Sequence, residues 1–101
     1  MIFNDVWKLI QAKLAIGVSI PNWTLNHGQI EGAFTIAEIA EDSIHAFVPT
    51  ARNLQKIPKV DFEEVFAMWP GYTSGRIARN EIRDKTRFSK YIISIFHWIE
   101  L

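Results

Sequence analysis

Residues 33–49 constrain the fold of this chain more than any other stretch, because their apolar side chains alternate with polar ones around a short polar break. The run AFTIAEIAEDSIHAFVP predicts two strands, 34–39 and 44–48, joined by a turn at 41–43. Pro49 lacks the amide hydrogen that a continuing strand would need, so the hairpin ends there. Both arms alternate imperfectly, which predicts a sheet with one buried face and one partly covered face.

The segments on either side of this hairpin carry weaker extended signals. Residues 54–57 predict a third strand, an edge strand that Pro58 closes. Residues 17–32 are interrupted by glycine, proline and asparagine, so we predict a loop there. Only 18–20 is expected to be extended, because the residue before Pro21 is pushed out of helical space.

Helices are expected near both ends of the chain. Residues 4–16 place apolar side chains four residues apart, and we expect Asn4 to cap this helix and Gly17 to end it. Near the other end, Ser89 is expected to cap a mostly apolar helix over 90–100.

Two further helices are expected between the strands and that last helix. Residues 61–69 carry a strong apolar stripe, and Asp61 with Glu64 three residues later forms a capping-box pattern. Pro70 is expected to stop this helix. Residues 76–86 predict a short helix with few apolar anchors.

The fold class that follows is α+β. A chain of 101 residues with 49% hydrophobic residues fits one domain, 1–101, with ample material for a core. We predict a small antiparallel sheet of two or three strands packed on helices, with a C-terminal helical hairpin.

Charge is balanced overall but unevenly distributed. Lys plus Arg and Asp plus Glu both number 11, so the net charge is zero, which argues against wholesale polyanion binding. Residues 1–50 hold two basic and five acidic residues, and residues 51–101 hold nine and six. Within the second half, residues 76–90 hold six basic residues against two acidic ones, which predicts a local anion-facing patch.

Several function classes find no support in the residue pattern. The chain has no cysteine, so disulfides, thiol nucleophiles and cysteine-based zinc sites are excluded. His27, His45 and His97 are far apart in sequence, and His45 is interpreted as a cross-strand neighbour. No nucleophile elbow or phosphate loop occurs, so we expect neither an enzyme nor a cofactor or metal. Without a signal peptide or a membrane-spanning run, a cytoplasmic location is the default expectation, with no membrane partner.

The helical pair at the C-terminal end resembles a known DNA-binding arrangement. In GRIARNEIRDKTRFSKYIISIFHWIE, a short helix is followed by a three-residue break beginning at Arg87 and then by a second helix. Residues 75–101 resemble in this respect the helix-turn-helix of winged-helix DNA-binding domains, whose second helix lies in the major groove.

The resemblance implies roles for the polar side chains of the pair. Ser89, Lys90, Ser94 and His97 would lie on the exposed face of the reading helix, close to basic side chains that contact phosphates. The set implied to bind nucleic acid is Arg76, Arg79, Arg83, Lys85, Arg87, Lys90, Ser94 and His97. Duplex nucleic acid is the partner that this implies. Alternatively, the polar side chains of the last helix are simply the solvent-facing side of a helix that packs in the core.

Two alternatives come from other classes of protein. Ile93 and Trp98 depart from the pattern of a groove-reading helix. Together with Tyr91 they are expected near the surface, where the three would form the interface of a homo-oligomer. The loop PNWTLNHG places Trp23 and His27 among amides, which predicts a pocket for a flat ligand, or alternatively a turn with Trp23 in the core. The short chain, without targeting or enzyme motifs, also resembles the orphan proteins carried on mobile genetic elements such as integron gene cassettes.

Overall fold

The computed structural model describes all residues from 1 to 101 and confirms the α+β class. The elements, in chain order, are α1 (Phe3–Lys13), β1 (Ser19–Thr24), β2 (Gly28–Ile39), β3 (Ser43–Val48), β4 (Asn53–Pro58), α2 (Lys59–Thr73), α3 (Arg79–Arg83) and α4 (Ser89–Trp98). The four strands form one antiparallel sheet in the order β1-β2-β3-β4. The sheet therefore has four strands, where two or three were predicted, and β1 is the strand that was not predicted.

The predicted loop at 17–32 is mostly strand, formed by β1 and the first residues of β2. The inward-facing side chains of β1 explain why the sequence pattern did not predict that strand. Ile20, Asn22 and Thr24 are the buried residues of β1, so two of its three inward positions are polar. Polar residues at inward positions remove the alternation by which a strand is recognised. The register shift between Pro21 and Trp23 interrupts the pattern further.

The predicted hairpin and edge strand are confirmed. Thr35 pairs with Phe47 and Ile39 with Ile44, so the turn falls at the predicted 41–43 region. The strand β4 pairs with β3 along its whole length and ends at Pro58, as predicted.

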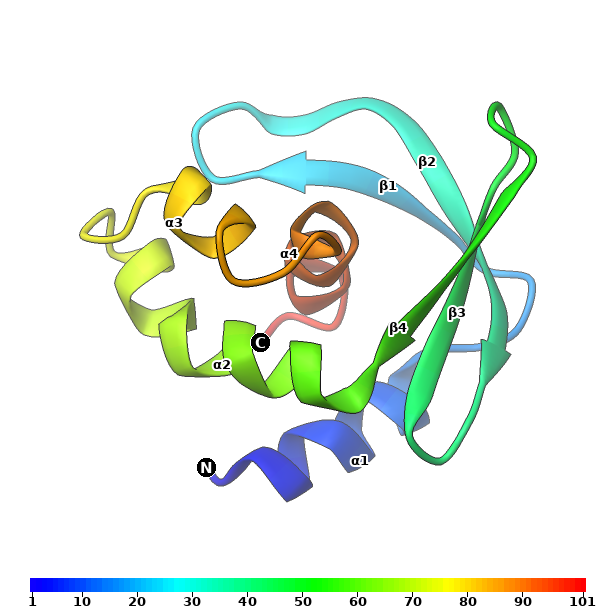
Figure 1. The fold of residues 1–101 in the computed structure, drawn as a ribbon, viewed down its shortest axis with the longest axis horizontal. Coiled ribbons are helices and arrows are strands. Elements are labelled where there is room, and N and C mark those ends of the chain that lie inside the picture. Colours follow the sequence, from blue (N-terminus) through cyan, green and yellow to red (C-terminus); the bar gives the residue numbers. More distant parts are fainter.

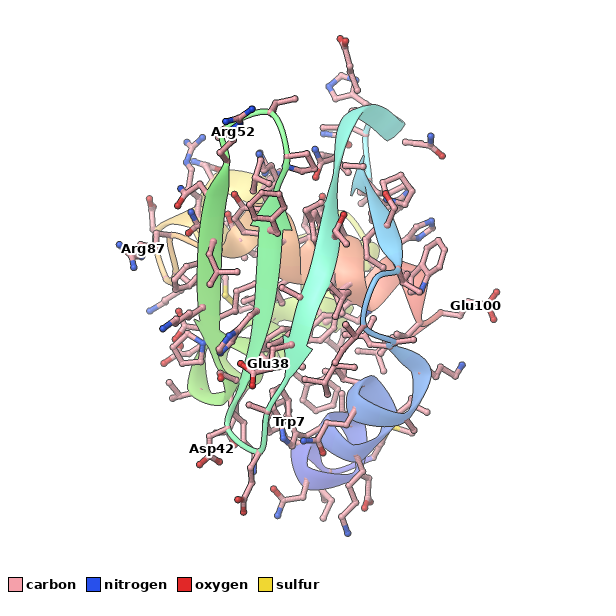
Figure 2. The ribbon with its side chains drawn as sticks, turned by 90° about the vertical axis from the view of Figure 1, so that its right-hand side faces the viewer. Trp7, Glu38, Asp42, Arg52, Arg87 and Glu100 are labelled. Carbon is pink, nitrogen blue, oxygen red and sulfur yellow. The ribbon has the colours of Figure 1, made fainter.

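Helices cover one face of the sheet and leave the other open. In Figure 1 the hairpin of β1 and β2 arches over α3 and α4, while α2 and α1 lie below. Figure 2 looks onto the outer face of the sheet, where no helix lies between the strands and the viewer. The side chain of Trp7 donates a hydrogen bond to the carbonyl of Glu41 at 2.9 Å, which ties α1 to the turn between β2 and β3.

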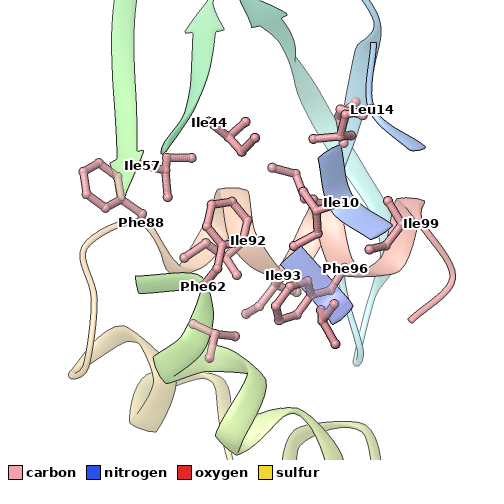
Figure 3. Close-up of a cluster of buried hydrophobic side chains, with 14 of the residues drawn as sticks. Ile10, Leu14, Ile44, Ile57, Phe62, Phe88, Ile92, Ile93, Phe96 and Ile99 are labelled. Atoms are coloured by element: carbon pink, nitrogen blue, oxygen red, sulfur yellow. The ribbon is translucent and has the colours of Figure 1, made fainter. Parts of the chain in front are cut away.

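The last helix, α4, is the centre of the core. Figure 3 shows its residues Ile92, Ile93 and Phe96 between side chains of α1, α2 and the sheet. Fully buried partners come from each of these elements, including Ile10, Ile44, Ile57 and Phe62. Burying a side chain of this size stabilises a fold by about 1.5–3 kcal/mol, so α4 contributes much of the stability.

The predicted helix caps were wrong. Neither Asn4 nor Ser89 caps a helix, because α1 begins after Ile2 and α4 begins after Phe88, both without a side-chain cap. The helix α1 ends at Lys13, before the predicted Gly17. These ends are set by packing of Phe3 and Phe88 in the core, which outweighs the modest gain from a cap.

The helix α2 is longer at both ends than predicted. It begins after Pro58, and Asp61 lies in its first turn, where its carboxylate accepts a hydrogen bond from the hydroxyl of Thr86 at 2.6 Å. The helix also continues past Pro70 to Thr73, whose hydroxyl donates to the Trp69 carbonyl at 3.0 Å. The prediction that Pro70 stops the helix was therefore wrong; without an amide hydrogen, Pro70 leaves the carbonyl four residues before it without its helical donor.

Candidate functional site

The polar side chains predicted to share an exposed face of the last helix do not form one. Ser89 is buried, at 4% exposed, where an exposed position was predicted. Ser94 is only 1% exposed, and its hydroxyl donates to the Lys90 carbonyl at 2.8 Å. The same hydroxyl accepts a hydrogen bond from the backbone amide of Trp23 at 3.1 Å. The expectation that Ser94 faces a partner was wrong, because β1 lies against that side of α4. Lys90 is half-buried and His97 is exposed.

The predicted interface residues separate in the same way. Ile93 is fully buried, so its expected place near the surface was wrong. Tyr91 is half-buried and packs edge-on against Phe34 at 5.2 Å between ring centroids. Trp98 alone is substantially exposed, at 44%. The predicted patch of three residues is therefore reduced to one aromatic side chain.

The basic segment, defined as residues 76–90, runs from the end of α2 through α3 to the start of α4. Its exposed cations are Arg76, Arg83, Lys85 and Arg87, while Arg79 and Lys90 are half-buried. The segment lies along α3 and the connection that follows it in Figure 1. The predicted phosphate-contacting residues Arg83, Lys85 and Arg87 are thus all exposed, on α3 and the turn that follows it.

None of these cations forms an ion pair within the chain. The one ion pair of the molecule joins His45 to Glu38, on the sheet. Arg76 donates instead to the Ser74 hydroxyl at 3.1 Å, and Arg87 lies over the Phe88 ring at 4.7 Å. Of the two carboxylates in the segment, that of Glu81 accepts the backbone amide hydrogen of Ala78 at 2.7 Å. The positive charges are therefore left available to an external anion.

Buried anchors hold the basic segment in place. Ile82 and Phe88 are buried on either side of the exposed turn between α3 and α4. Between them, the buried hydroxyl of Thr86 donates to Asp61 at 2.6 Å and accepts the backbone amide hydrogen of Phe88 at 3.0 Å. This turn is thus fixed to α2 and to the core, and its exposed cations project from a rigid base.

A second feature is an aromatic cleft at the opposite end of α4. Trp23 and His97 stack face to face, with 3.9 Å between ring centroids and 3° between planes. They line a surface cleft of about 360 Å³, the aromatic cleft, together with four further residues: Pro21, Gln29, Trp98 and Glu100. The predicted partnership of Trp23 with His27 is not formed in this cleft, because His27 is exposed in the turn after β1, with its backbone amide bonded to Thr24.

The sequence had indicated the members of this cleft without indicating that they meet. Trp23 and His97 are separated by more than seventy residues, and only the register of β1 against α4 brings them together. The hydrogen bond from the Trp23 amide to the Ser94 hydroxyl joins β1 to α4 at this point. No local spacing could have revealed it.

A third group, on the outer face of the sheet, was also absent from the sequence interpretation. The imidazole of His45 lies 2.9 Å from the Glu38 carboxylate and 3.0 Å from the Ser43 hydroxyl. His45 is a cross-strand neighbour of Glu38 and of Lys56, as interpreted from the sequence. A hydroxyl, an imidazole and a carboxylate in series form the relay that activates a nucleophile. None of the three lines a cleft of the molecule.

Other kinds of site find no support in the geometry. No three His, Asp or Glu side chains come together in a way that would hold a metal ion. None of the helices has the length and apolar character needed to span a bilayer.

No family model, curated protein or solved structure matches this chain. The resemblance of residues 75–101 to a helix-turn-helix, and the likeness to proteins of mobile elements, therefore stay predictions.

Proposed function

We propose that this protein is a non-enzymatic binding protein that contacts nucleic acid through the basic segment. The observation that carries the proposal is the set of four exposed cations, Arg76, Arg83, Lys85 and Arg87, with no ion pair among them. Nucleic acid presents closely spaced phosphates, and each cation that neutralises one releases condensed counterions. Free cations on a fixed turn are suited to this kind of contact.

The expected mode of contact differs from that of a groove-reading helix. Six of the ten residues of α4 are buried, among them Ser94, so this helix lacks the open polar face needed to reach base edges. The exposed cations lie on α3 and on the turns flanking it. Contacts from such positions go to phosphates, which set affinity and position but carry no base sequence. We therefore propose sequence-independent binding.

The charge distribution supports a local contact of this kind. The basic segment holds six basic and two acidic residues, a net charge of +4 in a chain of zero net charge. In Figure 2, Arg87 projects from the opposite edge of the molecule to Glu100. A nucleic acid approaching the Arg87 side would meet positive charge without facing this carboxylate.

A titration with mixed-sequence duplex DNA tests the proposal. At low salt we expect binding, and the logarithm of the association constant should fall linearly with the logarithm of salt concentration, with a slope of roughly −3 to −4 if all four cations contact phosphates. Duplexes of different sequence should bind equally. Absence of binding at low salt would overturn the proposal, and a slope near zero would favour an apolar contact such as one through Trp98.

A further inference from the structure

The aromatic cleft is independent of the basic segment and has the opposite electrostatic character. Its lining contains no Lys or Arg, and Glu100 provides its one carboxylate. Lys13 is nearby, since its ammonium donates to the Ile99 carbonyl at 3.0 Å, but it does not line the cleft. A phosphate would meet the Glu100 carboxylate and no Lys or Arg here, whereas a cation would meet an opposite charge.

The aromatic faces in the cleft favour a cation as well. Trp23 stacks on His97, and Trp98 beside it is 44% exposed, an unusual exposure for so large an apolar side chain. The face of an indole carries partial negative charge, and tryptophan is the side chain that attracts cations best by this means. Alkylated ammonium groups gain most, because they are weakly hydrated and lose little on leaving water.

The backbone at Glu100 provides an independent observation. The amide of Leu101 bonds to the Phe96 carbonyl and that of Glu100 to the His97 carbonyl, both at 3.0 Å, which is the Schellman arrangement that ends a helix. This arrangement places Glu100 at φ 59°, in the left-handed region where glycine is preferred.

Two costs therefore fall on this one residue. A side chain is strained in the left-handed region, and a carboxylate there lies at the negative end of the helix dipole of α4. Strain retained against a better alternative points to a role at the site. The Glu100 carboxylate has no partner in the chain, and Figure 2 shows its side chain extending outward, free to turn towards a ligand at the rim.

We propose that the aromatic cleft binds a small organic cation that carries a methylated ammonium group. Trp23 and Trp98 would contact the methyl groups, and Glu100 would supply the opposite charge at the rim. The volume of about 360 Å³ falls in the range of small-molecule sites.

Choline and its neutral carbon analogue, 3,3-dimethylbutan-1-ol, provide the test because they share shape and differ in charge. Each is titrated into the whole protein while the indole N–H signals of the four tryptophans are followed by NMR. We expect choline to shift the signals of Trp23 and Trp98, to leave that of Trp7, whose indole N–H is bonded to the Glu41 carbonyl away from the cleft, in place, and to bind more tightly than the alcohol. Equal binding of the two would overturn the cation assignment, and no shift with either would overturn the site.

Variants at the rim complete the test. Trp98→Ala should weaken choline binding by about two- to fivefold, since one exposed cation–π contact is lost. Glu100→Gln should weaken choline binding and leave the alcohol unaffected. The matched control Glu63→Gln removes an exposed carboxylate from α2 and should change neither. If Glu63→Gln weakens choline binding as much as Glu100→Gln does, attraction by net charge explains the result and the proposed site is wrong.

Discussion

At the scale of single residues, Ser94 links α4 to β1, two elements that are far apart in the sequence. Its hydroxyl serves both the backbone of α4 and the amide of Trp23, at the point where the register of β1 shifts. A strand amide released by such a shift has no partner in the sheet, and an unpaired buried amide is costly. Ser94 is therefore a structural residue of the core.

Ser94→Ala should consequently destabilise the fold by about 1–3 kcal/mol, since the Trp23 amide is left without its acceptor. The change is measured as a lower midpoint of urea unfolding with an unchanged slope. Ser89→Ala is the matched control, because Ser89 is also buried in α4 but its hydroxyl has no partner in the chain. Equal loss of stability in the two variants would show that the bond to Trp23 is unimportant.

Glu100 is the residue at which stability and the proposed binding site conflict. Glu100→Gly should raise the free energy of unfolding by about 1 kcal/mol, because glycine adopts the left-handed conformation without strain. Glu100→Ala removes the same charge but keeps a side chain at φ 59°, so it should stabilise the fold less. Thermal unfolding of the three proteins measures the difference. A more stable alanine variant would assign the effect to charge and not to strain.

At the scale of the elements, the sequence predicted the strands and helices that have a clear hydrophobic pattern. It did not predict the strand β1, which has polar side chains at inward positions. The hairpin of β2 and β3, the edge strand β4 and three helices follow from apolar spacing alone. The strand β1 escaped prediction because Asn22 and Thr24 occupy inward positions. The helix caps failed because tertiary packing fixed the ends of α1 and α4. For the candidate sites, composition indicated the basic segment, whereas the aromatic cleft depends on a long-range register.

Gly71 tests how α2 packs against the loop that follows it. A Cβ atom at this position would collide with Cδ1 of Ile77 and lie 2.7 Å from its Cγ1, so Gly71→Ala overpacks the contact. We expect a loss of about 1–2 kcal/mol, the cost of overpacking reduced by the higher helix propensity of alanine. Combined with Ile77→Ala, which removes the clash, the same substitution should stabilise the fold. Urea unfolding of the four proteins in the cycle measures the coupling, and additive effects would contradict the packing.

At the scale of the whole molecule, two surfaces of opposite charge lie at the two ends of one buried helix. The basic segment ends at the start of α4, and the aromatic cleft lies at its last turn. Since six of the ten residues of α4 are buried in the core, we expect this helix to hold the two surfaces at a fixed separation. We expect binding at one to leave the other unchanged, because a rigid helix offers no second arrangement through which to couple them.

The measurement that tests the proposed function most directly is duplex DNA binding by two charge-reversed variants. Arg83→Glu with Arg87→Glu reverses two cations of the basic segment, and Lys8→Glu with Arg52→Glu makes the same change in net charge elsewhere, at exposed residues without ion pairs. We predict that the first variant loses binding at low salt and that the second retains it with an unaltered salt slope. Equal loss in both variants, or binding retained when the basic segment is reversed, would contradict the role assigned to that segment.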